Sequence, residues 1–199
     1  GYDPKNVGRF LCEPHWGHAS TENFLHWEHH QVAVSPSING PDRNGCWSGS
    51  VVINDGVPTI IYSGLVKKSF EVEDRVSCLT QCFATGSKDM VHWQKSPSNP
   101  ILIDPPEEYR DRLNAWHDPY IWREGDIWYM LLGCAYKNWS GGLVLLYQSH
   151  DLVDWEYLHP FCEGMKTGER WLDPNFFPLG DRHVLLYVEP EGPMYLIGD

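Results

Sequence analysis

Positive charge and long apolar runs are both scarce in this chain of 199 residues. Lys and Arg number 15 against 27 Asp and Glu, which gives a formal net charge of −12 without any basic stripe. That balance argues against partners such as nucleic acid or an anionic membrane surface, because both attract clustered cations. No apolar run approaches the roughly 20 residues of a membrane-spanning helix. No signal peptide is visible at Gly1, but both ends look cut, so secreted and cytoplasmic locations stay equally open.

The six cysteines lack the spacing of a zinc site. Cys78 and Cys82 lie four positions apart, on one face of a strand, but no His or Cys pair completes a tetrahedral set. We interpret all six as buried thiols: Cys12, Cys46, Cys78, Cys82, Cys134 and Cys162. Disulfides remain the alternative for a secreted protein, in which Asn138-Trp139-Ser140 would be a glycosylation sequence.

A metal site built from His26, His29 and His30 is not expected. His26 belongs to a repeated phrase in which His92 and Asp154 take its place, so we interpret its role as structural. We therefore expect no metal and no cofactor.

Helical periodicity is lacking too, so helices should be few and short. Repetition is present instead. One phrase recurs at residues 21–27, 87–93 and 149–155: a hydroxyl residue, any residue, Asn or Asp, two apolar residues, a polar residue and Trp. A second repeat aligns residues 117–126 on residues 172–181 without gaps. Self-similarity at a period of about sixty residues indicates an architecture in which each unit buries its face against its neighbours.

Each unit has the pattern of a β-meander. Apolar, aromatic-rich runs are joined by Gly-containing turns, as in residues 120–122 and 127–132 around Glu124-Gly125-Asp126. A third strand, such as residues 142–149, leads into the repeated phrase, which supplies a turn and the entry to a fourth strand. Four strands per radial unit form a blade of a β-propeller, so the fold class is all-β. Most of the ten Trp, ten Tyr and seven Phe should fill the core between blades, and a few should face a ligand.

The innermost strands are expected to open with the most unusual residues, at 47–50, 117–119 and 172–174. Because these positions are equivalent by repeat, blade symmetry should bring Asp118 and Asp173 around one axis with Trp47, Ser48 and His117. Paired carboxylates across a pocket are the requirement for glycoside hydrolysis. The alternative is that Asp-Pro simply starts a strand, since Asp accepts hydrogen bonds from backbone N–H groups and Pro is tolerated at the start or edge of a sheet.

Several motifs resemble glycoside hydrolase family 32, the invertases, inulinases and levanases. HWGHA at residues 15–19 and LHWEH at 25–29 are similar to the family's W-G-H-A…L-V-x-W-E-H stretch, and GCWSGS at 45–50 resembles C-F-S-G-S. WHDPY at 116–120 resembles the R-D-P blade, and WLDPNFFPLGD at 171–181 resembles W-E-C-P-D-F-F-P-L-G-D. The matches follow the family's order along the chain.

The resemblance implies a five-bladed propeller that binds a fructosyl unit in its axial funnel. Residues 1–199 would form one partial propeller domain, covering roughly blades one to four and lacking the first strand of blade one and the fifth blade. The family cleaves β-fructosides such as sucrose, inulin and levan with retention, using an Asp nucleophile and a Glu acid/base. Asp118 matches the family's transition-state stabiliser.

Departures from the family pattern concern the catalytic residues. The nucleophile motif N-D-P-N-G would lie upstream, and Asp3-Pro4 does not match it. The acid/base Glu falls on Leu172; Asp173 is one position along and Glu169 lies on the loop before. His117 replaces the family's Arg, so a titratable imidazole stands where a permanent charge is usual.

Two hypotheses follow. The chain is part of a fructoside-cleaving enzyme in which Asp118 and Asp173 are catalytic and Trp47, Ser48 and His117 hold the sugar. Alternatively, it is an inactive relative that binds sugar or serves as a structural partner. A propeller open by a blade exposes strand edges, which favours an oligomer or an additional chain.

Overall fold

The computed structural model describes residues 13–66, 78–163 and 168–198. Asp3, Pro4 and Cys12 lie outside these residues. The two helical segments that carry labels are short: α1 (Glu107–Arg110) and the 3-10 turn η2 (Lys137–Trp139). No helix of the described part is both long and apolar enough to cross a membrane.

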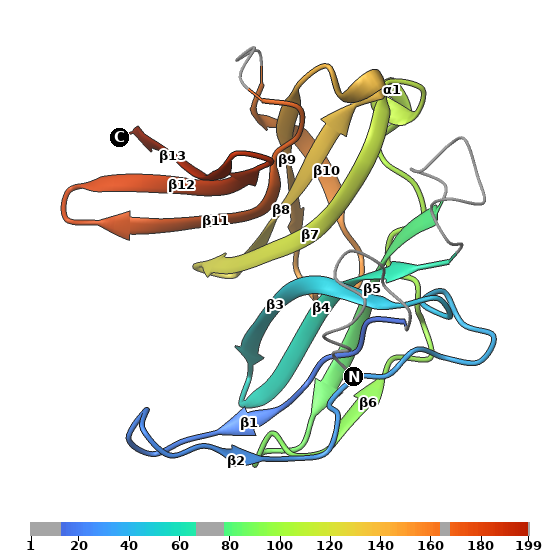
Figure 1. Ribbon diagram of the computed structural model, residues 1–199, viewed down its shortest axis with the longest axis vertical. Helices are drawn as coiled ribbons and strands as arrows, with labels where there is room; N and C mark the ends of the chain where they lie inside the picture. Colours follow the sequence, from blue (N-terminus) through green and yellow to red (C-terminus); the bar gives the residue numbers. More distant parts are fainter. Residues whose placement is uncertain (1–12, 67–77, 164–167, 199) are drawn as a thin grey trace.

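Four antiparallel sheets make up the described structure (Figure 1). The first pairs β1 (Ala19–Ser20) with β2 (Glu28–His29). The second contains β3 (Cys46–Asn54), β4 (Val57–Leu65), β5 (Leu79–Gly86) and β6 (Trp93–Lys95). The third contains β7 (Leu113–Glu124), β8 (Ile127–Tyr136), β9 (Gly142–Ser149) and β10 (Glu156–Cys162). The fourth contains β11 (Leu172–Leu179), β12 (Arg182–Glu189) and β13 (Gly192–Gly198).

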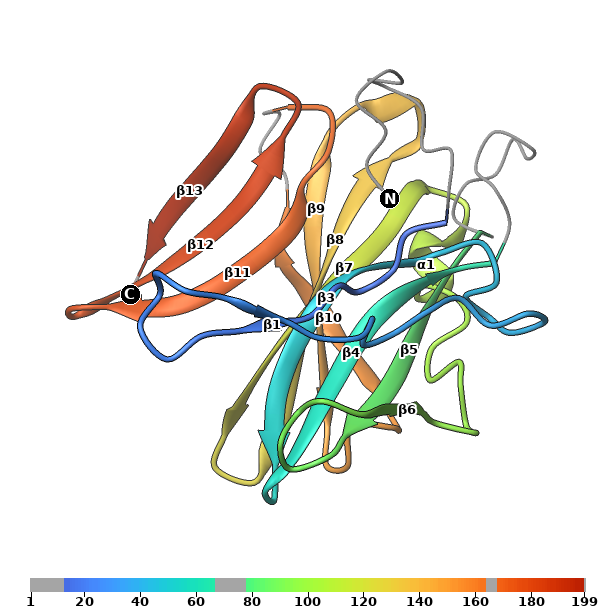
Figure 2. The same ribbon diagram turned by 60° about the horizontal axis from the view of Figure 1, so that its bottom comes forward.

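The sheets are arranged as blades around an axis, which confirms the all-β propeller. Within each sheet the strands follow chain order, and β3, β7 and β11 are the innermost strands. β7 contacts both β3 and β11, while the outer strands fan away from the axis (Figure 2). The described part thus forms several blades of a propeller, two of them with four strands.

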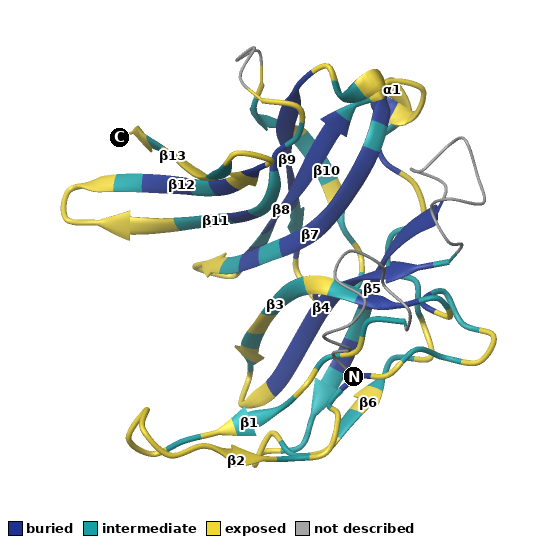
Figure 3. Cartoon of the chain, in the orientation of Figure 1, coloured by how far each residue is buried: buried dark blue, intermediate teal, exposed yellow. Residues whose placement is uncertain are grey.

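Apolar packing between adjacent blades supplies the core. One cluster joins Ile61 of β4 to Trp116, Met130 and Leu145 of the third sheet. A second joins that sheet to the fourth, where the rings of Trp171 and Tyr187 stack 4.4 Å apart. Burial is accordingly concentrated on the inner and middle strands such as β4, β8 and β9, whereas β13 is largely exposed (Figure 3).

The thrice-repeated phrase forms one kind of turn, as its sequence predicts. The Asn or Asp at its third position accepts a backbone N–H bond from the residue two positions on, in all three copies (Asn23, Asp89 and Asp151). The fourth residue has a left-handed backbone in each copy: Phe24 at φ 61°, Met90 at 60° and Leu152 at 68°. The outer strands β2, β6 and β10 begin at the closing Trp or directly after it.

The start of β7 was predicted wrongly. β3 and β11 do begin at or beside their candidate residues, but β7 begins at Leu113, four residues before His117. Leu113 and Ala115 are buried and pair with Tyr136 and Ala135 of β8, so apolar burial extends the strand. Asp118-Pro119 therefore lies inside a strand and does not start one.

The five described cysteines form no disulfide, and four of them are buried: Cys46, Cys78, Cys82 and Cys134. Cys162 is partly buried. The prediction of buried thiols is thus confirmed for four of the six cysteines.

Candidate functional site

A β-bulge interrupts each of the three innermost strands at the candidate residues. The register shifts between Cys46 and Gly49 in β3, between His117 and Tyr120 in β7, and between Leu172 and Asn175 in β11. A bulge adds an unpaired residue and re-aims the side chains around it. The candidate side chains therefore do not point alternately to the two faces of the sheet, as they would in a regular strand.

Asp118 and Asp173 occupy equivalent positions in their bulges. Both have left-handed backbones, with φ 61° and 48°, and Pro follows each. Asp tolerates this conformation better than most residues, although it is uncommon and strained for a non-Gly residue. The backbone N–H of Asp173 donates to Oδ2 of Asp118 over 3.3 Å, so the two Asp-Pro bulges meet.

His117 lies against the same carboxylate. Its Nδ1 is 2.6 Å from Oδ2 of Asp118, and both residues are buried, with 6% and 5% of their surface exposed. The two atoms are close enough for an ion pair, but Nδ1 has no partner in hydrogen-bond geometry, so charge attraction dominates the contact. The edge of the ring meets Trp47, with centroids 5.4 Å apart and planes at 87°.

The electrostatics of the site favour the protonated, positively charged form of the His117 ring. Burial alone lowers the pKa of His117, but attraction to Asp118, and additionally to Asp173, outweighs it and raises that pKa above its usual value. The positive charge of Arg170 lowers the pKa of His117, so this charge also acts on the site. Burial and the neighbouring Asp118 charge raise the pKa of Asp173, although a hydrogen bond from Ser48 and the charge of His117 act in the opposite direction.

The five predicted site residues are thus brought together at the axis. Trp47 touches His117, Ser48 bonds the Asp173 carboxylate, and His117 and Asp173 both contact Asp118. Ser48 is exposed, while Trp47 and Asp173 are partly buried. The site is a cluster of two carboxylates, an imidazole, a hydroxyl and an indole, open to solvent on the Ser48 side.

Two residues that support this cluster escaped sequence analysis. Ser63 of β4 accepts the backbone N–H of Asp118 over 2.9 Å and donates to Gln81 of β5 over 2.7 Å. Gln81 in turn donates to the carbonyl of Trp116 over 3.2 Å. Both side chains are fully buried, and a polar residue inside an otherwise apolar strand is the one signal that could have marked them.

Leu172 and Glu169 do not add a carboxylate to the cluster. Leu172 is partly buried and pairs with Val188 of β12. Glu169 is exposed and precedes β11, as predicted. No carboxylate therefore lies at the position that matches the family's acid/base Glu.

The described residues include no group of three or more His, Cys, Asp or Glu placed to hold a metal ion. His26 and His29 are exposed, and Nε2 of His30 lies 2.7 Å from the hydroxyl of Ser20.

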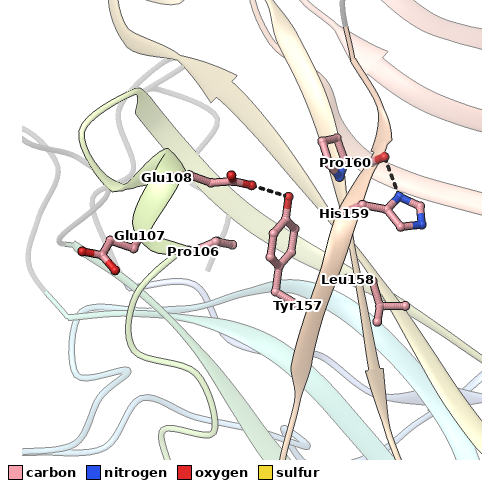
Figure 4. Close-up of a pocket in the computed structure, with 7 residues that line it drawn as sticks. All are labelled: Pro106, Glu107, Glu108, Tyr157, Leu158, His159 and Pro160. Atoms are coloured by element: carbon pink, nitrogen blue, oxygen red, sulfur yellow. Dashed lines mark hydrogen bonds between the residues drawn. The ribbon is translucent and has the colours of Figure 1, made fainter.

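A separate surface hollow, of about 660 Å³, lies away from the axial cluster. It runs between residues 106–108 and residues 157–160 of the outer strand β10 (Figure 4). Tyr157 donates to Glu108 over 2.8 Å across it. None of the residues of the axial cluster lines this hollow, so its chemistry is separate from that of the candidate site.

Comparison with known proteins gives matches along nearly the whole chain. The model of the glycosyl hydrolases family 32 N-terminal domain matches residues 3–197. The chain is 36% identical over 180 residues to sucrose-6-phosphate hydrolase of Escherichia coli, covering 89% of this chain and 35% of that protein. It is 38% identical over 188 residues to sucrose-6-phosphate hydrolase of Salmonella typhimurium, covering 92% and 37%. The chain therefore spans little more than a third of the length of these relatives.

Solved structures show the same fold. A mutant of the Bombyx mori GH32 beta-fructofuranosidase in complex with sucrose superposes with a TM-score of 0.75 at 32% identity, over 93% of this chain and 39% of that one. A fructan 1-exohydrolase IIa variant from Cichorium intybus in complex with 1-kestose gives a TM-score of 0.78 at 28% identity, over 99% and 38%.

Proposed function

Because the chain belongs to glycoside hydrolase family 32, we propose that it forms the axial sugar site of a β-fructofuranosidase-type glycosidase. The substrate class is a β-fructoside of the sucrose, inulin or levan type. The complexes of two structural relatives with sucrose and 1-kestose support a carbohydrate ligand of this kind.

The carboxylate of Asp118 is the observation that carries the proposal. It is buried where the innermost strands of neighbouring blades meet, and it faces both the His117 ring and the Asp173 N–H. Glycoside cleavage passes through an oxocarbenium-like state, so a fixed negative charge beside the sugar stabilises the transition state more than the ground state. Asp118 would bind fructosyl hydroxyls and supply that charge.

Asp173 is the proposed proton donor. Its raised pKa favours the protonated carboxyl, which can transfer a proton to the leaving oxygen as the glycosidic bond breaks. Trp47, Ser48 and His117 would hold the sugar ring, since they surround the two carboxyl groups.

The test is fructose release from sucrose and inulin by the full-length protein. Asp118→Asn should lower the rate by about 100-fold or more, the scale seen when a group that stabilises transition-state charge is removed. Asp126→Asn is the matched control, because Asp126 is fully exposed in the β7–β8 turn. Equal rates for wild type and Asp118→Asn would contradict the catalytic role.

A second candidate function rests on Leu172. An apolar side chain at the family's acid/base position is consistent with a protein that binds sugar without cleaving it, or that completes a propeller with another chain. Titration of tryptophan fluorescence with fructose, sucrose and inulin separates these cases. Binding without turnover supports a sugar-binding module, whereas no binding, together with a larger assembly in light scattering, supports a structural partner.

A further inference from the structure

The bulge at Asp118 and Pro119 lies on the edge of its sheet. β7 pairs with β8 on one side, and on the other side it contacts the second sheet. Backbone N–H and C=O groups on such an edge need partners once they are buried. Asp118 also has a left-handed backbone, with φ 61°, which persists at a non-Gly residue only where surrounding contacts fix it. The place of the Asp118 carboxylate therefore depends on the groups that bond this edge.

Two hydroxyls of the second sheet bond the backbone of the bulge. Ser50 of β3 donates to the carbonyl of Pro119 over 3.0 Å and accepts the N–H of Ile121, also over 3.0 Å. Ser63 of β4 accepts the N–H of Asp118 itself over 2.9 Å. The backbone is thus fixed at the Asp118 N–H by one strand and directly after Asp118 by another.

Gln81 of β5 orients the Ser63 hydroxyl. Its Oε1 accepts the Ser63 proton over 2.7 Å, and its Nε2 donates to the carbonyl of Trp116 over 3.2 Å. Because the proton points to Gln81, the Ser63 oxygen presents a lone pair to the N–H of Asp118. The side chains of Ser63 and Gln81 are fully buried, so bulk water does not compete for these bonds.

The carboxylate fixed in this way in turn contacts the rest of the axial cluster. Oδ2 of Asp118 accepts the N–H of Asp173 over 3.3 Å and lies 2.6 Å from Nδ1 of His117. Bonds therefore run in one series from the second sheet to β7 and on to β11. A shift of the bulge in β7 would change both contacts of the carboxylate.

We propose that Ser50, Ser63 and Gln81 are positioning residues. Through the backbone of β7, they fix the Asp118 carboxylate at the axis in the geometry that the reaction needs. The inference rests on the proposed function, because it assigns the residues that prepare Asp118 for the sugar. A preorganised charge stabilises a transition state without reorganising during the reaction, and a displacement of about 1 Å can lower the rate on the order of 100-fold.

The experiment removes the Ser63 hydroxyl at constant side-chain size. Ser63→Thr and Ser63→Val share any strain from added methyl groups, but only the Thr variant keeps the hydroxyl. Fructose release from sucrose by the full-length protein should show kcat lower by about tenfold or more for Ser63→Val than for Ser63→Thr, with KM within about threefold. Such a split indicates weaker stabilisation of the transition state with ground-state binding retained.

Two further variants test the same role without adding atoms at Ser63. Ser50→Ala removes the bonds to Pro119 and Ile121, and Gln81→Leu removes the acceptor of the Ser63 proton. Each should lower kcat by about tenfold with little change in KM. These variants keep the test decisive if the larger side chains at position 63 prevent folding.

NMR of the His117 imidazole gives a readout that needs no substrate. Attraction to Asp118, and additionally to Asp173, raises the pKa of His117 against burial and the charge of Arg170. A displaced Asp118 carboxylate attracts the ring less. The pKa of His117 should therefore be lower in Ser63→Val than in Ser63→Thr.

Ser149→Ala is the matched control. Ser149 is also buried and accepts hydrogen bonds from the N–H groups of Asp151 and Leu152, but it lies at the turn between β9 and β10. Loss of its hydroxyl should lower the midpoint of thermal unfolding, as in the other variants. It should leave kcat and the His117 titration unchanged, because no bond of Ser149 reaches the bulge.

Equal kcat values for the two Ser63 variants, or an identical His117 titration in both, would overturn the positioning role. Failure of the proposed function gives a different result. If the full-length wild-type protein releases no fructose, the catalytic proposal fails, and the His117 titration alone then decides whether these residues position Asp118.

Discussion

The backbone N–H of Asp173 donates a 3.3 Å hydrogen bond to Oδ2 of Asp118, and this contact joins the innermost strands of two blades at one carboxylate. His117 lies 2.6 Å from the same oxygen. The charge of Asp118 is therefore shared between an imidazole and a backbone donor in a buried setting. Any change in the protonation of His117 alters the charge that a ligand meets at the axis.

The first prediction concerns the pH dependence of stability. The pKa of His117 is raised on folding, so the native protein holds this proton more tightly than the unfolded chain does. Its contribution to stability is complete below the unfolded value of about 6.5 and is lost as the pH rises through the folded pKa. Urea unfolding from pH 5.5 upward should show the free energy of unfolding falling across that window.

Replacement of His117 or its partner provides the check on this assignment. His117→Gln should flatten the pH dependence, and Asp118→Asn should lower the pKa of His117 as followed by NMR of the imidazole ring. A His117 resonance that titrates below the ordinary value in wild type would contradict the ion pair.

The second prediction concerns the ion pair between Asp42, which precedes β3, and Lys95 at the end of β6. The carboxylate of Asp42 is 1% exposed and accepts hydrogen bonds from Lys95 and Tyr62. Asp42→Ala should destabilise the protein by about 3–5 kcal/mol, because it leaves a partly buried ammonium without its partner. Asp104→Ala should cost less than about 1 kcal/mol, since Asp104 pairs with Arg110 on the surface. Chemical denaturation of both variants measures the difference, and equal costs would contradict it.

Acid titration of the same variants adds a second readout. Burial raises the pKa of Asp42, but hydrogen bonds from Lys95 and Tyr62 outweigh burial, so the net pKa is lowered. The stability from Asp42 is therefore present above pH 3.8, its ordinary value, and is lost as the pH falls through the folded pKa. Asp42→Ala should remove this part of the acid sensitivity.

The third prediction uses two copies of the repeated turn. Met90 and Leu152 share a left-handed backbone, but Met90 is 44% exposed and Leu152 is fully buried. Met90→Gly should stabilise the protein by up to about 1 kcal/mol, because Gly adopts this conformation without steric cost. Leu152→Gly should destabilise it by about 2–5 kcal/mol, because lost packing exceeds that gain. Thermal unfolding of the two variants should shift the midpoint in opposite directions, and shifts of the same sign would show that burial does not decide the outcome.

Much of the fold could be predicted from local sequence. The phrase that ends in Trp27, Trp93 and Trp155 marks the turn before an outer strand. The side chain of its Asn or Asp accepts a hydrogen bond from the backbone N–H two residues later, and this local bond does not depend on the surrounding structure. The Gly-containing turn at residues 124–126 likewise marks the β7–β8 hairpin. The start of β7 was missed because Leu113 joins the strand through burial against the neighbouring sheet, which no local motif records.

The sequence by itself determined the strands, the turns, the family and the five candidate residues that repeat symmetry gathers at one axis. Only the tertiary structure decided how these residues meet, because the bulges at Asp118 and Asp173 change side-chain direction and cannot be located from residue types alone. It also brought in Ser63 and Gln81, which lie outside the motifs along the chain. Their roles come from contacts between blades, and such contacts exist only after distant segments have packed.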